Sequence, residues 1–125
     1  MLAGLVVADL LAVAVNRSLV RVEGPSMEPS LRAGDVLLTV PASRRMLRPG
    51  RVVVVADPTQ PGHLVVKRVR RVRPSGIEVL GDLAERSTDS RQWGPLPPGA
   101  IRRVVLARWP DVRSPVHHRP ELTSD

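Results

Sequence analysis

Short valine-rich runs, each ended by a glycine or proline turn, constrain the fold of this chain more than any other feature. Valine supplies 21 of 125 residues, and 13 prolines and 9 glycines interrupt the runs. β-Branched residues favour strands, whereas Gly and Pro end them. The unbroken run 52–55 is typical of a strand covered on both faces. We predict six strands, at 19–23, 36–40, 51–57, 64–72, 77–80 and 101–108.

The spacing of these strands indicates the fold class. They do not alternate with helical patterns, so a parallel βαβ architecture is not expected. We therefore predict a mainly β protein with a small antiparallel coiled sheet or barrel, preceded by an N-terminal apolar helix.

The two ends of the chain differ from this pattern. Residues 2–15 form an apolar run that only Asp9 interrupts. As a helix it would be about 21 Å long, shorter than the ~30 Å hydrocarbon core, and it lacks the basic start of a signal peptide. We expect 1–18 to be an apolar helix and possible membrane anchor, 19–109 the folded core domain and 110–125 a flexible tail. The expected location is the cell membrane, weakly anchored or peripheral, with the cytoplasm as the alternative.

The composition excludes several classes of function. Cysteine is absent, which rules out disulfides, cysteine-ligated zinc and thiol catalysis. Only Trp93 and Trp109 are aromatic, and the arginines are spread over several segments, so no specific nucleic-acid binding is expected. Attraction of the arginines to phosphates or anionic lipid head groups stays open. The three histidines lack further ligands at metal spacing, so neither a metal nor another cofactor is expected.

Lys67 is the only lysine beside 18 arginines. A guanidinium stays protonated at any ordinary pH, whereas burial can make an amine neutral. On a strand, Lys67 shares an apolar face with Val65 and Val69, while the neighbouring arginines face the other way. Either this amine has a chemical role, or it is a residual lysine in an arginine-biased chain whose side chain extends along the valines to water.

Ser26 lies in a rigid turn directly after a predicted strand, where Gly24 and Pro25 restrict the backbone. A hydroxyl in such a turn can be presented to a cleft, and a neutral amine can remove its proton. On its own the pattern also fits an ordinary turn-forming serine.

Four blocks in order then resemble one enzyme family, the type I signal peptidases, in a compact form. Together they cover most of positions 20–97, and the only lysine stands at the expected place. The blocks are Gly24-x-Ser26-Met27-x-Pro29-x-Leu31, Gly34-Asp35-Val36, Val66-Lys67-Arg68-Val69, and Gly81-Asp82 followed by Ser87-x-Asp89-Ser90-Arg91-x-Trp93-Gly94.

The resemblance implies that Ser26 is the nucleophile and Lys67 the general base, with the Ser26 N–H helping to form the oxyanion hole. Two positions depart from the family pattern: Gly24 replaces a serine that can bind the oxyanion, and Leu83 replaces an asparagine. The supporting residues implied are Ser87, which orients the amine, Asp89 and Arg91, which form an ion pair, and Gly81 and Asp82, which begin the same loop.

The function implied is that of a serine endopeptidase that cleaves N-terminal leader or signal peptides from precursor proteins by a Ser/Lys dyad. Its partner would be a precursor bound as an extended strand, with membrane association. One alternative is a dedicated maturation protease for a single precursor, like the compact relatives that process nickel superoxide dismutase. Another is a non-catalytic β domain that binds peptides or anionic surfaces. A self-cleaving repressor is disfavoured because no helix-turn-helix precedes the catalytic part.

Overall fold

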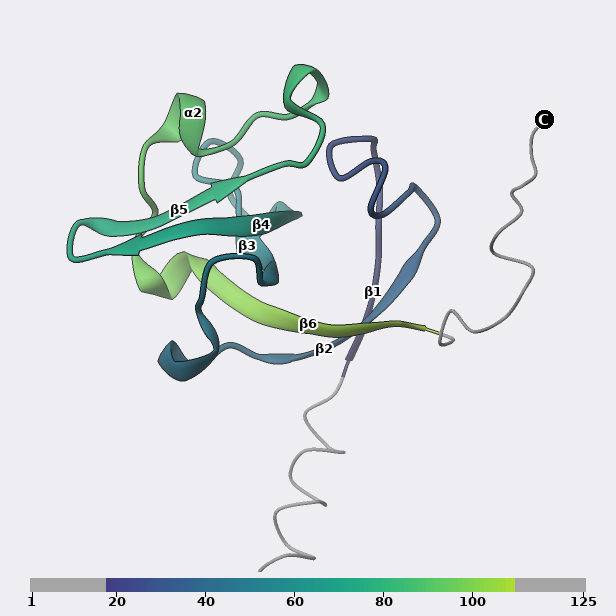
Figure 1. Cartoon of the computed structure of the whole chain (residues 1–125). Coiled ribbons are helices and arrows are strands. Elements are labelled where there is room, and N and C mark those ends of the chain that lie inside the picture. The colour runs from purple at the N-terminus through teal and green to yellow at the C-terminus, as the bar shows by residue number, and fades with distance from the viewer. Residues whose placement is uncertain (1–17, 110–125) are drawn as a thin grey trace, which may run out of the picture.

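The structure, a computed structural model, describes residues 18–109, which form one antiparallel six-stranded sheet (Figure 1). The order of the strands in the sheet is β1-β2-β6-β3-β4-β5. All six predicted strands are found, with boundaries within two residues of those expected. Their bounds are β1 Ser18–Arg21, β2 Val36–Pro41, β3 Val52–Ala56, β4 Leu64–Arg73, β5 Gly76–Leu80 and β6 Ile101–Trp109.

The sheet is antiparallel, as predicted, but it does not close into a barrel. Within residues 18–109, β1 pairs only with β2 among the six strands and β5 only with β4, so the two outer strands do not meet. The outer edge of β5 is partly covered by a single bridge from Ile77 to Leu96. Three register shifts bend the sheet; one lies between Val69 and Arg71, where the alternation of β4 breaks down.

One predicted boundary at the N-terminus is wrong. Ser18 was expected to end the apolar helix, but it begins β1, because it pairs with Thr39 in the ladder and their hydroxyl oxygens lie 3.0 Å apart. Residues 1–17 of the expected helix and the expected tail at 110–125 lie outside the described residues. In the part that is described, no helix has the length and apolarity needed to cross a membrane.

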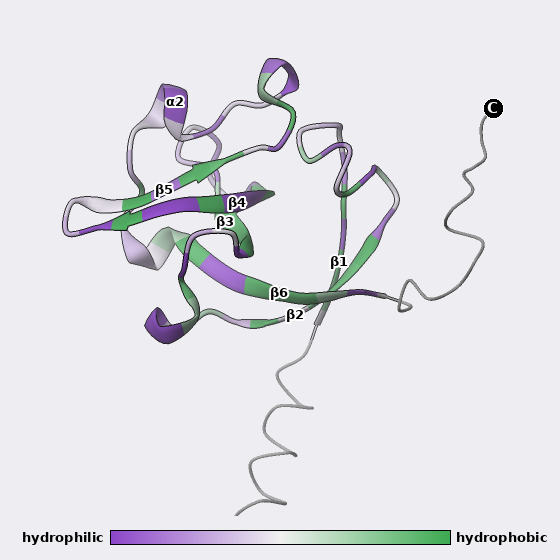
Figure 2. Ribbon diagram, in the orientation of Figure 1, coloured by the Kyte–Doolittle hydropathy of each residue, from purple (hydrophilic) through white to green (hydrophobic). Residues whose placement is uncertain are grey.

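The core lies around β3, one of the two middle strands of the sheet. Val53, Val54 and Val55 are each at most 1% exposed, so both faces of β3 are covered, as the unbroken run indicated. Figure 2 shows hydrophobic stretches along β3, β5 and β6. Each buried valine contributes about 1.5–3 kcal/mol relative to an exposed one. Val54 faces the other side of the sheet and lines the cavity of Ser26. Val53 and Val55 belong to one buried cluster, whose other members are Leu47, Val69, Ile77, Val79, Leu96, Ile101 and Val104.

Short helical turns connect the strands. They are η1 (Arg44–Met46), η2 (Ala84–Arg86), α2 (Ser90–Trp93) and η3 (Pro98–Ala100). The segment 81–94, expected to be a polar loop, contains η2 and α2. Asp89 caps α2 by accepting from the Arg91 backbone N–H at 3.0 Å, and Ser90 accepts from the Val79 N–H at 2.9 Å. These bonds fix the loop against β5.

Candidate active site

Lys67 lies in the middle of β4 and is only 3% exposed. Its partner across the ladder is Val53 of β3, which is fully buried, and Val69 on its own face is also buried. Arg70, one step out of phase, is exposed. The prediction that Lys67 occupies the apolar face of this strand is therefore confirmed.

Burial has a direct effect on this amine. It lowers the pKa of Lys67 below its ordinary value of 10.5, because the charged form loses its hydration. The negative charge of Asp89 opposes this change, and the positive charge of Arg91 adds to it. The pKa of Lys67 remains lowered, so the neutral amine is more accessible than in a solvated lysine.

The Lys67 amine is hydrogen bonded within a short chain of polar groups. Its Nζ donates to Ser87 Oγ at 3.0 Å, and Ser87 Oγ donates to Asp89 Oδ2 at 2.6 Å. Asp89 is fully buried. Burial alone would raise the pKa of Asp89, but bonds from Arg91, Ser87 and the Gly81 N–H hold it well below its usual range. Asp89 is therefore a carboxylate that only accepts hydrogen bonds.

This arrangement decides how the Lys67 lone pair is used. A serine hydroxyl has one O–H, and Ser87 uses it to donate a hydrogen bond to Asp89. Toward Lys67, Ser87 can therefore only accept. A neutral amine has two N–H bonds and one lone pair. With one N–H directed to Ser87, the lone pair of Lys67 stays available for a proton from another hydroxyl.

Asp89 is itself held by a charged partner. Arg91 donates to both carboxylate oxygens, from Nε at 3.0 Å and from Nη2 at 2.6 Å. The same Nη2 donates to the Gly81 carbonyl at 3.2 Å, and the Gly81 N–H donates to Asp89 Oδ2 at 2.8 Å. Charge-assisted bidentate pairs of this kind restrict geometry strongly. The pair therefore ties the Ser87–Asp89 segment to the end of β5.

Gly81 is the point where this loop meets the turn that carries Ser26. A Cβ on Gly81 would overlap the Ser87 side chain and come within 2.8 Å of the Ser26 carbonyl oxygen. That oxygen accepts from the Leu83 N–H at 2.8 Å. Because Leu83 makes this bond with its backbone, the bond does not depend on the side chain at this position. The Ser26 turn and the Ser87 loop are thus in direct contact.

A second ion pair, missed in the sequence, supports the same contact from the other face of β4. Arg68 donates to Asp82 from Nε at 2.9 Å and from Nη2 at 2.8 Å, and its Nη1 donates to the Gly50 carbonyl at 2.9 Å. The hydrogen bonds from Arg68, and a further one from Ser30, hold the pKa of Asp82 below its usual range. The sequence signal for this ion pair was the position of Arg68 next to Lys67 in the strand, because alternation directs the Arg68 side chain to the opposite face.

Ser26 is half-buried and lines a cavity of about 220 Å³. Most of the walls are aliphatic, and His63, which the sequence analysis left without a role, lies among them. Within residues 18–109, no hydrogen bond joins Ser26 directly to Lys67. The lining residues are Val20, Arg21, Val22, Glu23, Ser26, Met27, Val54, His63, Leu64, Val65 and Val66.

Gly24 stands two residues before Ser26 and has a φ of +78°, with open space where a Cβ would lie. This backbone conformation favours glycine. The position therefore provides no side-chain hydrogen-bond donor.

Metal-binding residues do not gather in the part of the chain that the structure covers. Residues 18–109 contain no group of three or more His, Cys, Asp or Glu side chains placed to hold a metal ion.

Comparison of the sequence with known proteins identifies the family of the chain. The model of the family described as "Peptidase S24-like" matches residues 6–82. Mitochondrial inner membrane protease subunit 1 of Mus musculus is 32% identical over 70% of this chain and 66% of its own length. The Xenopus tropicalis subunit 1 is 34% identical with the same coverage, and subunit 1b of the Arabidopsis thaliana mitochondrial ATP-independent inner membrane protease is 35% identical.

The chain thus spans about two thirds of the length of the relatives that it matches. The resemblance to signal-peptidase-like proteases, inferred from four short motifs, is confirmed by these matches. The chain belongs to the Peptidase S24-like family.

Proposed function

We propose that the protein is a serine endopeptidase that removes N-terminal leader peptides from precursor proteins, with Ser26 as nucleophile and Lys67 as general base. The observation that carries this proposal is the buried Lys67 amine, bonded to Ser87 in a loop that packs on the Ser26 turn. The family and the names of the relatives, which are proteases, support the same class of reaction.

The reaction follows from the roles of these groups. Neutral Lys67 removes the proton of the Ser26 hydroxyl, and Oγ bonds to the scissile carbonyl carbon. The oxygen of that carbonyl becomes an anion, which the Ser26 N–H stabilises. Lys67 then gives its proton to the leaving amine as the peptide bond breaks. A water molecule, deprotonated by Lys67, finally hydrolyses the acyl-enzyme and regenerates Ser26.

Ser26 and Lys67 are not yet hydrogen bonded in the free protein. Catalytic hydrogen bonds often tighten only when substrate binds, so their absence here is compatible with the roles proposed. Substrate would bring the reacting hydroxyl and the free lone pair of Lys67 together from adjoining elements.

An extended peptide is the form of substrate that the site favours. β1 has an open edge within the described sheet, and its residues Val20 and Arg21, with Val22 just after it, line the Ser26 cavity. A peptide can add to such an edge through its backbone and place alternate side chains into the cavity. Aliphatic walls and a volume of about 220 Å³ suit a small apolar side chain.

We also infer that the protein works at a membrane surface. Its relatives are named for an inner membrane, which supports membrane association in general. The apolar run at 2–15 is the segment of this sequence that would attach it. We propose weak or peripheral attachment, with residues 19–109 as the catalytic core.

The test uses an active-site probe and a substrate screen. We expect an acylating serine-hydrolase probe to label the full-length protein and to fail on Ser26→Ala. Ser75→Ala, an exposed serine in the turn between β4 and β5, is the matched control. N-terminal mass spectrometry of cells lacking the gene should reveal precursors that keep their leaders. Equal labelling of Ser26→Ala, or an unchanged set of N-termini, would reject the proposal.

A further inference from the structure

A second cleft lies away from Ser26, and the proposed reaction does not use it. Its volume is about 400 Å³, and it is enclosed by η1, the β4–β5 hairpin and the segment at η3. Leu47, Val72, Ile77 and Pro98 line it with apolar surface, and Arg44 and Arg73 contribute two cations. None of these residues lines the Ser26 cavity. The cleft therefore combines an apolar surface with two arginine side chains.

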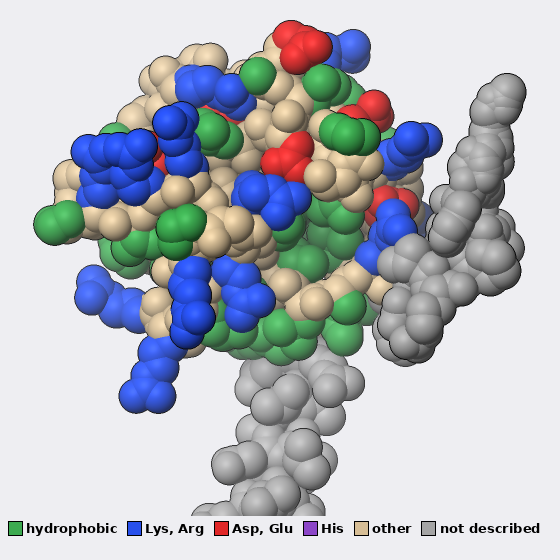
Figure 3. Space-filling model, in the orientation of Figure 1, with side chains coloured by type: hydrophobic (Ala, Val, Ile, Leu, Met, Phe, Trp, Pro, Cys, Tyr) green, Lys and Arg blue, Asp and Glu red, His purple; other side chains and the backbone are tan. Residues whose placement is uncertain are grey.

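The surroundings of this cleft are strongly basic. Arg73 forms an ion pair with Glu78 at 3.4 Å, but Glu78 is the only acid on the elements that enclose the cleft. Figure 3 shows basic side chains gathered around the hairpin and below it, whereas acidic ones appear mainly on the upper and right-hand parts of this face. Among the arginines that form no ion pair within residues 18–109 are Arg44, Arg45, Arg48, Arg71 and Arg102.

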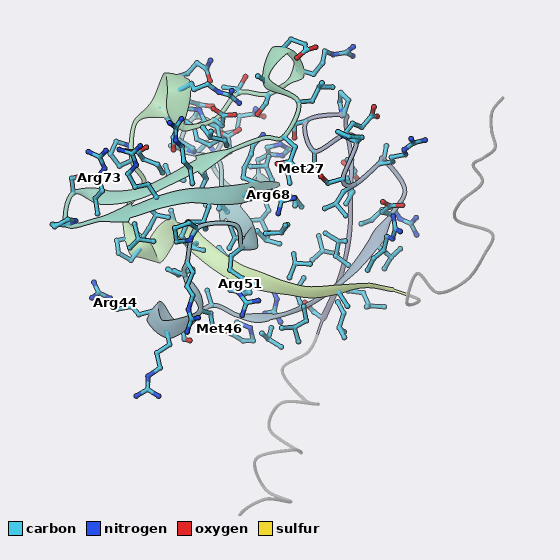
Figure 4. The ribbon with its side chains drawn as sticks, viewed as in Figure 1. Met27, Arg44, Met46, Arg51, Arg68 and Arg73 are labelled. Atoms are coloured by element: carbon cyan, nitrogen blue, oxygen red, sulfur yellow. The ribbon has the colours of Figure 1, made fainter. Side chains whose placement is uncertain are left out.

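The register of the sheet sets where the cleft lies relative to the N-terminus. Ser18, the first residue of β1, pairs with Thr39, and β2 continues past it to Pro41 and then to Arg44. The cleft is thus at the end of the β1–β2 pair at which the described chain begins with Ser18. Figure 4 shows Arg44 and Arg73 on one side of the molecule and Met27, the neighbour of Ser26, on the other.

We propose that this arginine-lined cleft binds the head group of an anionic phospholipid and seats this end of the domain on a negatively charged membrane. Guanidinium groups bind phosphate oxygens in a bidentate manner, and the apolar surface suits the adjoining glycerol and acyl carbons. A bilayer surface matches both the charge of the cleft and its position at the end of the β1–β2 pair where the described chain begins. The inference rests on the membrane association proposed above but not on the peptidase chemistry.

The test is vesicle binding by the full chain. We would compare vesicles of phosphatidylcholine alone with vesicles that contain equal parts of phosphatidylcholine and phosphatidylglycerol. The apolar N-terminal run contributes to binding of both vesicles, so the difference between them isolates the electrostatic contribution. The Arg44→Gln/Arg73→Gln variant should lose about thirtyfold in affinity for the anionic vesicles, from about 1 kcal/mol per arginine near such a surface.

The matched control removes the same charge elsewhere. Arg32 and Arg86 are exposed and form no ion pair among residues 18–109, so Arg32→Gln/Arg86→Gln should keep the preference for anionic vesicles. Both double variants should cleave a soluble precursor peptide normally, which separates this inference from the proposed function. Equal losses in the two variants would show an effect of net charge alone and overturn the site. Tighter binding to single-stranded RNA than to anionic vesicles would also overturn it.

Discussion

The Ser87 hydroxyl donates its one hydrogen bond to Asp89 Oδ2 at 2.6 Å, and this bond determines how the Lys67 amine can be used. Because Asp89 is buried and ionised, it can only accept, so the Ser87 O–H points to it. The Ser87 oxygen then accepts a hydrogen bond from the Lys67 amine. The lone pair of a neutral Lys67 is then kept free. Asp89 thus acts through Ser87 as a positioning residue for the proposed base.

Lys67→Arg should abolish cleavage although it preserves the positive charge. A guanidinium stays protonated and cannot accept the Ser26 proton, so we expect a loss of at least about 10²-fold in kcat. The measurement is cleavage of a precursor peptide. Arg70→Lys, a conservative exchange at an exposed position of the same strand, is the control and should be neutral. Normal turnover by Lys67→Arg would rule out a lysine base.

Asp89→Asn should move the pH dependence of cleavage as well as slow it. The Asp89 charge raises the pKa of Lys67, so its removal, with Arg91 left unneutralised, lowers that pKa further. The rising limb of the activity profile should therefore move to lower pH. The rate should also fall, since an amide can donate to Ser87 and turn its proton toward the Lys67 lone pair.

Glu78→Gln removes an acid on β5 that pairs with Arg73 and makes no hydrogen bond to this network, so it should leave the limb where it is. A purely structural role for Asp89 would lower the rate without moving the limb. An unmoved limb in Asp89→Asn would therefore contradict the electrostatic coupling between Asp89 and Lys67.

Gly81→Ala should disrupt the contact between the Ser26 turn and the Ser87 loop. The added methyl would overlap Ser87 and press on the Ser26 carbonyl, so we expect the free energy of unfolding to fall by about 1–3 kcal/mol and cleavage to be impaired. Chemical denaturation and peptide cleavage measure the two effects. Gly99→Ala, with open space around the new methyl, is the control. Equal stability of the two variants would show that the loop yields easily.

Lys67 should also make folding stability depend on pH. Its pKa is lowered in the folded state, so between that lowered value and 10.5 the unfolded chain binds more protons than the folded one. Stability relative to Lys67→Met should therefore rise as pH increases through this window, and the cost of burying the charge is fully present below it. Denaturant unfolding of both proteins at several pH values measures the difference. A difference that is constant with pH would mean that Lys67 is not desolvated.

The strands were accessible from sequence because their signals are local. Valine runs and the glycine or proline turns between them locate all six strands, and the alternation in β4 separates the buried Lys67 from the exposed Arg70. The closed barrel that the sequence left possible is not formed. Whether β1 meets β5 depends on the total twist and on register shifts, which no short segment encodes.

For the candidate site, the motif blocks named the residues and implied two of their contacts, Ser87 with Lys67 and Asp89 with Arg91. Ser26, Lys67 and Ser87 could be nominated one by one, and the family match supports the class of enzyme they imply. The Arg68–Asp82 pair and the position of His63 on the Ser26 cavity were not foreseen. Both depend on contacts between segments that are distant in the chain.

The order of residues by itself therefore determined which segments are strands, which face of β4 carries Lys67 and which family the protein joins, since each follows from local pattern or from motif identity. Only the tertiary structure decided that Gly81 lies against both Ser26 and Ser87, and that Asp89 accepts the hydrogen bond of the Ser87 hydroxyl. It also decided that Arg44 and Arg73 share one cleft. Such relationships arise from the way the whole sheet packs, because packing brings together groups that sequence separation leaves unrelated.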